Sequence, residues 1–411
     1  MINVCRFSKT SLFLNSIKKL KLDIITMSKK LKYGMVGGSL DAFIGEVHRK
    51  AAALDSKFSL VAGAFSSSPE KSKKTGEALG IEPNRTYGSY KEMIEKESQL
   101  PEDERIDVVS IVTPNHVHFD PAKIALEHGF HVIIDKPLAF NTQEARDLKK
   151  IVDETGLVLA LTHTYTGYPM VKEAKEYVRE GKLGKIRQVY VEYPQGWLSM
   201  PLEEEGNKQA SWRTDPERSG AGGSIGDIGT HAANLAEYVT GLNITHICSD
   251  INTKVEGRKL DDNAAALLKF EDGATGVLMV SQIATGEEND IKVRVYGDKA
   301  GVEWKQSDQN TLLYKPLEGP HQIIRAGTGY LSDVAQANTR TPAGHPEGYL
   351  EAFANIYVAF HQAVVDHQSG DYKSASDYDF PDVVDGIRGM VFVDKMIESS
   401  KSETKWTTIE L

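Results

Sequence analysis

Cysteine is scarce in this chain of 411 residues, which contains only Cys5 and Cys248. Two cysteines cannot supply the disulfide framework of a small secreted domain. No apolar run approaches the ~20 residues that a membrane-spanning helix needs. Basic residues are outnumbered, with 48 Lys and Arg against 58 Asp and Glu and a net charge of -10, which argues against nucleic acid or anionic membranes as partners. We therefore expect a soluble protein of a reducing compartment, the cytoplasm, without nucleic-acid or membrane partners.

The first residues differ from the rest of the chain in composition. Basic residues between Arg6 and Lys21 face one acid, Asp23, and the apolar cluster at residues 11–14 is too short for a signal peptide. Two interpretations of residues 1–27 stay open. They are a mitochondrial presequence, although such segments usually prefer arginine to lysine, or an upstream extension of a chain that starts at Met27. Either way this leader is expected to be disordered and to lie outside the fold.

A strand, a glycine turn and a helix follow the leader. The apolar run Leu31 to Val36 leads into Gly37 and Gly38, and a helical pattern begins near Phe43 and Ile44. Glycines let backbone amides approach a pyrophosphate, and the helix start attracts its charge, so this unit predicts dinucleotide binding. Ser39 stands where a glycine is usual and the turn has about three extra residues compared with the compact motif. Taken alone, the pattern fits a plain structural turn nearly as well.

The second predicted strand, residues 58–65, bears on the choice of cofactor. NAD-binding proteins usually place an acid after this strand to bind the ribose hydroxyls. This chain has Ser66 and Ser67 there, with Lys71 a turn later. Hydroxyls and a nearby lysine could receive the 2′-phosphate of NADP, while the same serines could simply start the next helix. The cofactor is therefore predicted as NAD or NADP.

Two further strands end in polar residues. The strand at residues 107–112 runs into Thr113, Pro114, Asn115 and, after His116, His118. The two histidines lack the thiols or carboxylates that would complete a metal site, so no metal is predicted and the loop is assigned to the nicotinamide side of the cleft. The buried run His131 to Ile134 is followed by Asp135 and Lys136, then a proline. Ligands bind at such carboxyl ends of parallel strands.

Strand–helix alternation over residues 28–158 predicts a doubly wound parallel sheet, a dinucleotide-binding Rossmann domain. Closely spaced strands predict a second domain at residues 159–411, α+β with a large, mostly antiparallel sheet. We expect residues 305–345 to be irregular. A closing helix at about residues 382–399 is a candidate to pack back on the first domain.

A second polar cluster lies at the start of a helix in the second domain. Asp227 and His231 are four residues apart and would share one helix face. His231 could take a hydroxyl proton and Asp227 could orient it or hold the hydroxyl, while a capping aspartate beside a structural histidine is the alternative. Aromatic and polar residues elsewhere suggest a pocket the size of a sugar: Tyr165, Gln195, Trp197, Trp212, Arg213 and His345.

Together these motifs resemble the Gfo/Idh/MocA oxidoreductase family over residues 30–400. The resemblance rests on the glycine turn, on residues 113–118, on Asp135-Lys136-Pro137-Leu138 and on Asp227-Ile228-Gly229-Thr230-His231. It implies NAD(P)-linked chemistry on sugars, inositols and related polyols, in dimers or tetramers formed through the second sheet. It also implies that Lys136 contacts the reacting hydroxyl and the cofactor, that His231 is the acid/base and that Asp227 is its acidic companion. The chain departs from the family at two points: Asp135 stands where the family usually has a glutamate, and the glycine loop is longer than the family's.

Three functions are compatible with this sequence. The first is a dehydrogenase in which His231 removes a hydroxyl proton and Lys136 stabilises the alkoxide. The second is a glycoside hydrolase that uses NAD transiently, through oxidation and elimination. The third is a dinucleotide sensor without activity, which the intact set of Lys136, Asp227 and His231 argues against. The sequence favours the dehydrogenase.

Overall fold

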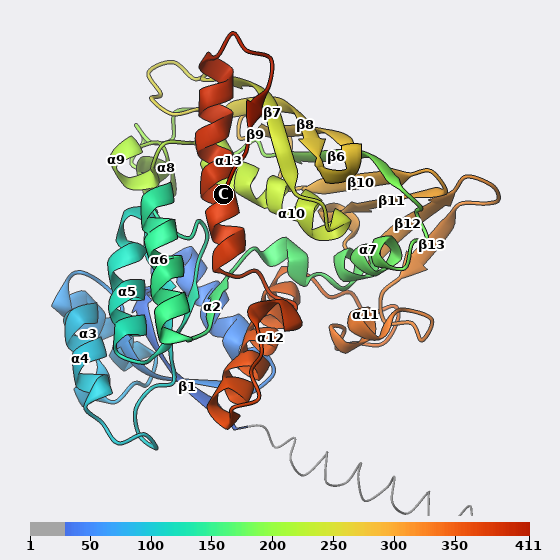
Figure 1. Cartoon of the computed structure of the whole chain (residues 1–411). Helices are drawn as coiled ribbons and strands as arrows, with labels where there is room; N and C mark the ends of the chain where they lie inside the picture. Colours follow the sequence, from blue (N-terminus) through green and yellow to red (C-terminus); the bar gives the residue numbers. More distant parts are fainter. Residues whose placement is uncertain (1–28) are drawn as a thin grey trace, which may run out of the picture.

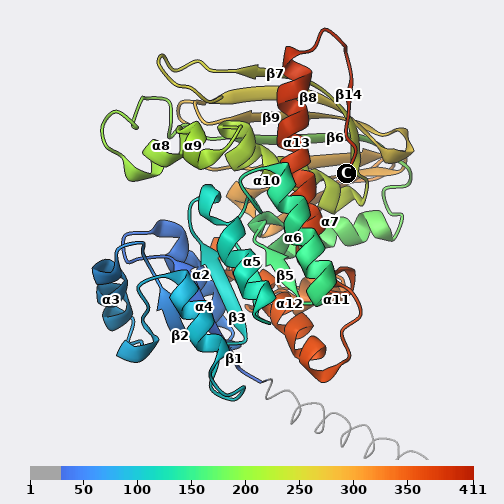
Figure 2. The ribbon, with the colours of Figure 1, turned by 60° about the vertical axis from the view of Figure 1, so that its left-hand side comes forward.

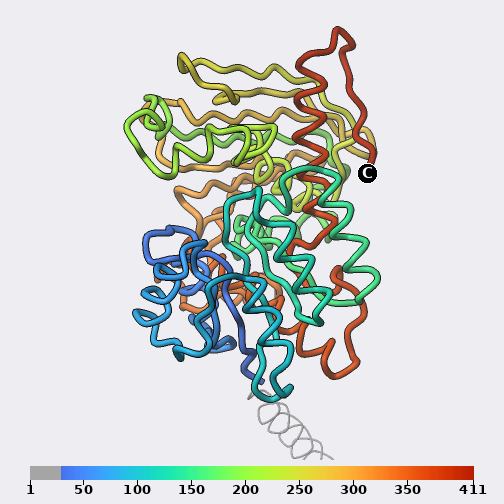
Figure 3. Tube along the Cα trace, turned by 90° about the vertical axis from the view of Figure 1, so that its left-hand side faces the viewer, coloured from blue at the N-terminus to red at the C-terminus, as the bar shows by residue number. Residues whose placement is uncertain are grey.

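The computed structural model describes residues 29–411, so the predictions for the leader lie outside the described residues. Two β-sheets, each covered by helices, make up the molecule (Figure 1). Seen from the side, the first sheet and its helices form the lower part and the second sheet forms the upper part (Figure 3).

The first sheet has five parallel strands in the order β2-β1-β3-β4-β5, which confirms the predicted doubly wound sheet. Every residue of β3, β4 and β5 is buried, because helices cover both faces of a parallel sheet. The strands are β1 (Leu31–Gly37), β2 (Phe58–Ala64), β3 (Val108–Val112), β4 (His131–Ile134) and β5 (Leu159–Leu161).

Three of the five α-helices between these strands begin at capping side chains. Ser68, Ser89 and Asn141 each accept a hydrogen bond from a backbone N–H of the first turn, the usual role of such residues. The helices are α2 (Phe43–Leu54), α3 (Pro69–Ala78), α4 (Tyr90–Ser98), α5 (Phe119–Glu127) and α6 (Thr142–Thr155). Helices α4, α5 and α6 cover one face of the sheet, and α2 lies on the other.

The second sheet has nine strands in the order β13-β12-β11-β10-β6-β9-β8-β7-β14. Only the β6–β9 pair is parallel within this sheet, so the prediction of a mostly antiparallel sheet is confirmed. The strands are β6 (Ile186–Pro194), β7 (Ile244–Asn252), β8 (Asn263–Phe270), β9 (Thr275–Ser281), β10 (Lys292–Gly297), β11 (Ala300–Lys305), β12 (Thr311–Pro316), β13 (Gln322–Arg325) and β14 (Thr407–Thr408). The accompanying helices are α7 (Pro169–Arg179), α8 (Lys208–Arg213), α9 (Pro216–Ser219), α10 (Thr230–Thr240) and α11 (Asp333–Ala337).

The prediction that residues 305–345 are irregular was wrong. This stretch contains the strand pair β12–β13 and the short helix α11. Three of the four residues of β13 are exposed, because it is the edge strand, so no alternation of buried and exposed residues marks it in the sequence. Strands β7, β11 and β14 were also not predicted.

Two late helices connect the two parts of the molecule. Helix α12 (Tyr349–Ser369) packs on α2, and its Tyr357 meets Phe58 of β2 edge to face, with 5.3 Å between the ring centroids. Helix α13 (Val383–Lys401) contacts α6 at one end and β7 at the other (Figure 2). Ile387 and Met390 of α13 join the apolar cluster on the α4–α6 face. The first sheet is therefore enclosed by residues from the end of the chain.

Candidate active site

A cavity of about 1030 Å³ lies at the carboxyl ends of the first sheet's strands, where open parallel sheets bind ligands. Its wall combines the first domain with loops, helices and strands of the second. Most of the predicted site residues line it: Gly37, Gly38, Ser39, Phe43, Ile44, Ser66, Ser67, Thr113, Pro114, Asn115, Asp135, Lys136, Tyr165, Gln195, Trp212, Arg213, Asp227 and His231. His118, Trp197 and His345 are not among the residues that line it.

The glycine turn forms a cradle that side chains would fill. Gly38 has φ +75°, and a Cβ on it would lie 2.8 Å from the Met35 sulfur. A Cβ on Gly45 would lie 2.3 Å from the Cα of Gly38, so glycine at both positions lets α2 approach the turn. Backbone amides and the start of α2 thus border the cavity without intervening side chains, which fits the pyrophosphate of a dinucleotide.

The mouth of the cavity carries a charge cluster that includes both domains. Asp41 accepts hydrogen bonds from Lys71 at 2.8 Å, from Lys208 of α8 at 2.9 Å and from the Ser39 hydroxyl at 2.6 Å. These donors, Lys71 first, hold the pKa of Asp41 well below its usual range. Ser66, which also lines the cavity, follows β2. Hydroxyls and lysines therefore border this end of the cavity.

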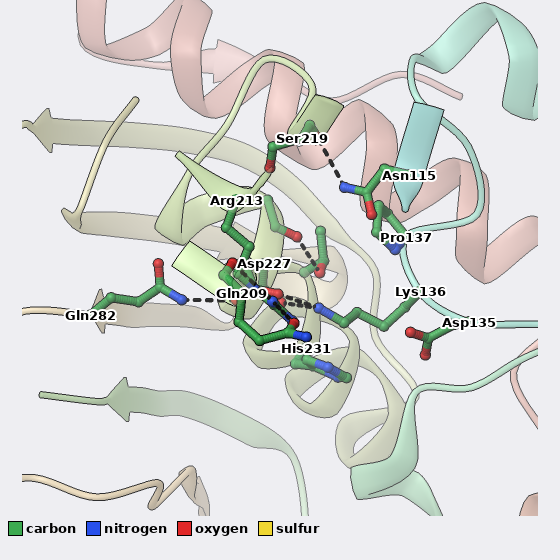
Figure 4. Close-up of polar contacts among 12 residues, drawn as sticks. Asn115, Asp135, Lys136, Pro137, Gln209, Arg213, Ser219, Asp227, His231 and Gln282 are labelled. Atoms are coloured by element: carbon green, nitrogen blue, oxygen red, sulfur yellow. Dashed lines mark hydrogen bonds and ion pairs between the residues drawn. The ribbon is translucent and has the colours of Figure 1, made fainter. Parts of the chain in front are cut away.

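The loop after β3 borders the cavity and is fastened at two points. Asn115 donates a hydrogen bond from Nδ2 to the backbone oxygen of Ser219 at 2.8 Å, from the first domain to the second (Figure 4). His118 lies behind the loop, fully buried, with its ring nitrogens 2.7 Å from the Pro137 oxygen and 2.8 Å from the Thr113 oxygen. It thus links the loop to the turn that follows Lys136.

Lys136 and Asp227 form the centre of the polar cluster. The Lys136 ammonium donates to Oδ1 of Asp227 at 2.6 Å and to its backbone oxygen at 2.7 Å (Figure 4). The other carboxylate oxygen accepts from Arg213 at 3.1 Å and from Gln282 at 2.8 Å. Burial opposes the ionisation of Asp227, but Lys136 and Arg213 outweigh it and hold its pKa well below the usual range. Asp227 is therefore a carboxylate at neutral pH.

His231 stands in α10, directly after an unusual helical turn. Residues Ile225–Gly229 form a π-helical turn, a feature that is frequent at functional sites, where the sequence predicted an ordinary first turn. Both Asp227 and His231 nevertheless face the cavity. Burial, with the positive charge of Lys136, holds the pKa of His231 well below its ordinary value. The ring is therefore neutral at pH 7 and can accept a proton.

Asp135 is held by Thr162, just after β5, and lies near His48 of α2. Its Oδ1 accepts the Thr162 hydroxyl proton at 2.9 Å and lies 3.8 Å from Nε2 of the buried His48. Nδ1 of His48 in turn lies 2.8 Å from the Tyr357 hydroxyl of α12. His48 and Lys136 outweigh burial and lower the pKa of Asp135. The shorter acid at this position is thus supported from behind by a buried polar chain.

Aromatic and amide side chains line the far wall. The Tyr165 and Tyr193 hydroxyls are hydrogen-bonded to each other, and Tyr193 donates to Asn289 at 2.8 Å. The Arg213 guanidinium lies 4.2 Å from the Trp212 ring centroid. Trp197 contributes only indirectly, since its Nε1 donates to Gln195 Oε1 at 3.0 Å. Such a wall can stack on and hydrogen-bond a polyhydroxylated ring.

The structure does not bring His345 to the cavity. Its loop is held by Glu347, which accepts hydrogen bonds from the backbone N–H groups of Arg340 and Thr341, and His345 is exposed. The residue of this region that lines the cavity is Tyr349, at the start of α12.

Several residues at the site escaped the sequence reasoning. Tyr193 ends a predicted strand, and that position could have marked it. His163 and Gln282 come just after the strands β5 and β9, which is a position that could have marked them too. Asn289 lies in a polar loop, and no sequence pattern distinguishes it from its neighbours. Within residues 29–411 no cluster of three His, Cys, Asp or Glu could hold a metal, and no helix there is long and apolar enough to cross a membrane.

Comparison with known proteins agrees with this geometry. Residues 31–163 match the family described as oxidoreductase family, NAD-binding Rossmann fold, and residues 171–303 match the GFO/IDH/MocA C-terminal domain. An uncharacterized oxidoreductase of Bacillus subtilis strain 168, YfiI, is 33% identical over 383 residues, 92% of this chain and 97% of the relative. Levoglucosan dehydrogenase of Pseudarthrobacter phenanthrenivorans is 27% identical over 307 residues, 69% of this chain and 76% of the relative.

The fold also matches solved structures along most of its length. An inositol dehydrogenase homolog from Azotobacter vinelandii, complexed with NAD+, has a TM-score of 0.88 and 34% identity and covers 93% of this chain and 99% of its own. A structure of such a homolog with NADH and myo-inositol has a TM-score of 0.86 and the same identity and coverage. The chain therefore belongs to the GFO/IDH/MocA family of NAD-binding oxidoreductases, as its motifs predicted, and its cofactor is NAD or NADP.

Proposed function

We propose that the protein is a dehydrogenase that oxidises a hydroxyl group of a sugar, an inositol or a related polyol. The observation that carries the proposal is the convergence of Lys136, Asp227 and His231 on one cavity that also contains the glycine turn. Bound there, NAD or NADP would accept or supply the hydride. The glycine turn, Ser66, Ser67 and residues 113–115 would hold it, and the neighbouring wall of Tyr165, Gln195, Trp212 and Arg213 would hold the substrate.

The polar residues divide the remaining chemistry between them. His231 is neutral and takes the proton of the reacting hydroxyl. Lys136 uses two of its three N–H donors on Asp227, which leaves one for the oxygen that becomes negative as the proton departs. Asp227 fixes the ammonium in place, and Arg213 and Gln282 fix Asp227. The Lys136 ammonium is therefore already in position before the substrate binds, as the stabilisation of a developing negative charge requires.

The relatives support the substrate class but do not name the substrate. One is a levoglucosan dehydrogenase, and another, scyllo-inositol 2-dehydrogenase (NAD(+)) of Bacillus subtilis strain 168, is 27% identical over 217 residues. Both names describe oxidation of a ring hydroxyl, which agrees with the aromatic and amide wall of this cavity.

The test is cofactor reduction with NAD and with NADP across monosaccharides, inositols, anhydrosugars and aryl glycosides, with glycoside cleavage followed in the same wells. Steady formation of NADH or NADPH from a free sugar or polyol is the expected result. Glycoside cleavage without net reduction would replace this proposal with the NAD-dependent hydrolase. Cofactor binding without turnover on any substrate would favour a sensor.

We also propose that the protein self-associates through the second sheet. Helices α7, α10 and α13 cover one face of that sheet, and on the other face Leu267 and Met279 are about half exposed, at 46% and 54%. They lie on the neighbouring strands β8 and β9. Light scattering after size-exclusion chromatography should give a dimer or tetramer, which Leu267→Glu with Met279→Glu should dissociate. A monomeric wild-type protein would contradict this.

A further inference from the structure

A second histidine lies against the proposed acid/base. The Nδ1 atoms of His163 and His231 are 3.3 Å apart, and the rings meet edge to face at 80° with centroids 5.1 Å apart. We propose that His163 is a positioning residue that keeps a proton on Nδ1 of His231, so that Nε2 of His231 is left bare to accept the substrate's proton. This inference rests on the function proposed above.

The contact permits one proton between the two rings. A neutral imidazole has one N–H and one bare nitrogen, so one Nδ1 must donate and the other must accept. If His231 donates, its Nε2 is bare and can act as a base. If His163 donates, Nε2 of His231 carries the proton and can only donate a hydrogen bond, so it has no lone pair to take the substrate's proton. His163 therefore determines which role the neutral His231 can play.

The hydrogen bonding of His231 leaves Nε2 as the ring nitrogen without a partner among the described residues. His231 lines the cavity, while His163, which occupies Nδ1, is 2% exposed and does not line it. Among the residues that the structure describes, His163 is the only hydrogen-bond partner of the His231 ring. Nδ1 is thus occupied by a buried side chain, and Nε2 is the nitrogen left for a substrate.

The environment of His163 keeps its ring neutral. Burial, together with the positive charge of Lys136, lowers its pKa to about 3. Its backbone oxygen accepts hydrogen bonds from the hydroxyl and the N–H of Thr166, at 2.9 and 3.2 Å. The preceding residue, Thr162, binds Asp135. Two successive residues after β5 therefore support two different residues of the cavity wall.

The proton transfer balances without a further reactant. The O–H bond of the substrate breaks and an Nε2–H bond forms, which makes His231 an imidazolium. Its Nδ1–H remains donated to the neutral His163 throughout. The hydrogen bond to His163 becomes charge-assisted at that moment and so strengthens as the transfer proceeds.

The first measurement is the position of the ring protons, read by NMR of protein labelled with ¹⁵N-histidine, with His231→Asn for assignment. Wild-type His231 should carry its proton on Nδ1. His163→Asn, whose side-chain oxygen can still accept at that point, should keep this pattern, and His163→Phe should move the proton to Nε2. Wild-type His231 protonated on Nε2, or an unchanged pattern in His163→Phe, would overturn the proposal. This measurement needs no substrate, so it is decided even if the proposed function fails.

Kinetics supply the second measurement, with the exposed His321→Asn as the control. In His163→Phe we expect kcat to fall by roughly 10²- to 10⁴-fold, the range associated with general acid–base catalysis, while the Kd of the dinucleotide stays within about twofold. His163→Asn should retain kcat within about tenfold of the wild type. Equal losses in the Asn and Phe variants, or losses in kcat and cofactor affinity together, would indicate a structural role and refute the inference.

Discussion

Replacing Lys136 by methionine removes the ammonium and keeps most of the side-chain volume. Two hydrogen bonds to Asp227, at 2.6 and 2.7 Å, are lost, and a carboxylate that is only 13% exposed loses its nearest cation. Breaking a buried ion pair costs about 3–5 kcal/mol. Arg213 and Gln282 remain on the other carboxylate oxygen, so we expect a loss of unfolding free energy of about 2–3 kcal/mol, below that range.

The effect on catalysis should be larger than the effect on folding. Removing one donor that stabilises a developing negative charge costs about 10²- to 10³-fold in kcat. Asp227, left with Arg213 as its remaining cation, would add repulsion at the same oxygen, so we expect kcat/KM to fall by about 10³-fold or more, which corresponds to about 4 kcal/mol. The Kd of the dinucleotide should change by less than about threefold, because the ammonium is directed at Asp227.

The assay combines steady-state turnover, dinucleotide titration and chemical denaturation, with Lys149→Met as the control. Lys149 lies on the surface of α6 in an i,i+4 pair with Asp153, and its loss should change none of these quantities appreciably. The double variant Lys136→Met with Asp227→Asn should be more stable than the sum of the two single losses predicts, because it leaves neither the lysine without its carboxylate nor the carboxylate without its lysine. Near-normal turnover of folded Lys136→Met, or additive stability losses, would refute the reasoning.

Three further changes test other parts of the molecule. Asp41 binds Lys71 and Lys208, the lysines that would also bind the 2′-phosphate of NADP. Asp41→Asn should therefore lower the KM for NADP more than the KM for NAD. Equal changes in the two KM values would contradict this. Lys71→Ala should raise the KM for NADP by about tenfold and change that for NAD little, and the ratio of the two KM values measures it. Burial and Asp382 raise the pKa of Asp385 from 3.8 to about 7. Between these two pH values the folded protein keeps a proton on Asp385 that the unfolded chain releases. The stability of the folded protein therefore falls as the pH rises through this window. Asp385→Asn should gain in thermal stability relative to the wild type between pH 5 and pH 8, and parallel melting curves would show that Asp385 does not titrate there.

The first sheet was predictable because its signals are local. Unbroken apolar runs such as Val132–Ile134 mark strands buried on both faces, and glycines such as Gly156 mark helix ends. The polar residues that follow those strands must then meet at one edge, which is why Lys136 could be assigned to the cleft.

The remaining features depend on long-range packing. The pairing of Tyr193 with Asn289, and of His163 with His231, joins residues on different elements that no spacing in the sequence relates. His345 has the polar surroundings of a site residue, yet the hydrogen bonds of Glu347 keep its loop away from the cavity. The edge strand β13 was missed because only one of its four residues is buried, so its sequence shows no alternation of apolar and polar residues.

The position of α12 has a consequence for synthesis on the ribosome. One face of the first sheet, with Phe58 and Tyr33, is closed by Phe353, Tyr357 and Phe360, which follow β5 by on the order of 190 residues. At a synthesis rate of ~5–20 residues per second, α12 is made roughly 10–40 s after the last strand of the sheet, and that face lacks these aromatic side chains until then. The nascent nucleotide-binding half therefore has an unprotected apolar surface during this interval, and it needs a chaperone or the rapid arrival of α12 to avoid aggregation. A chain that ends before residue 349 would lose its cofactor-binding half, although every residue of the glycine turn would be present.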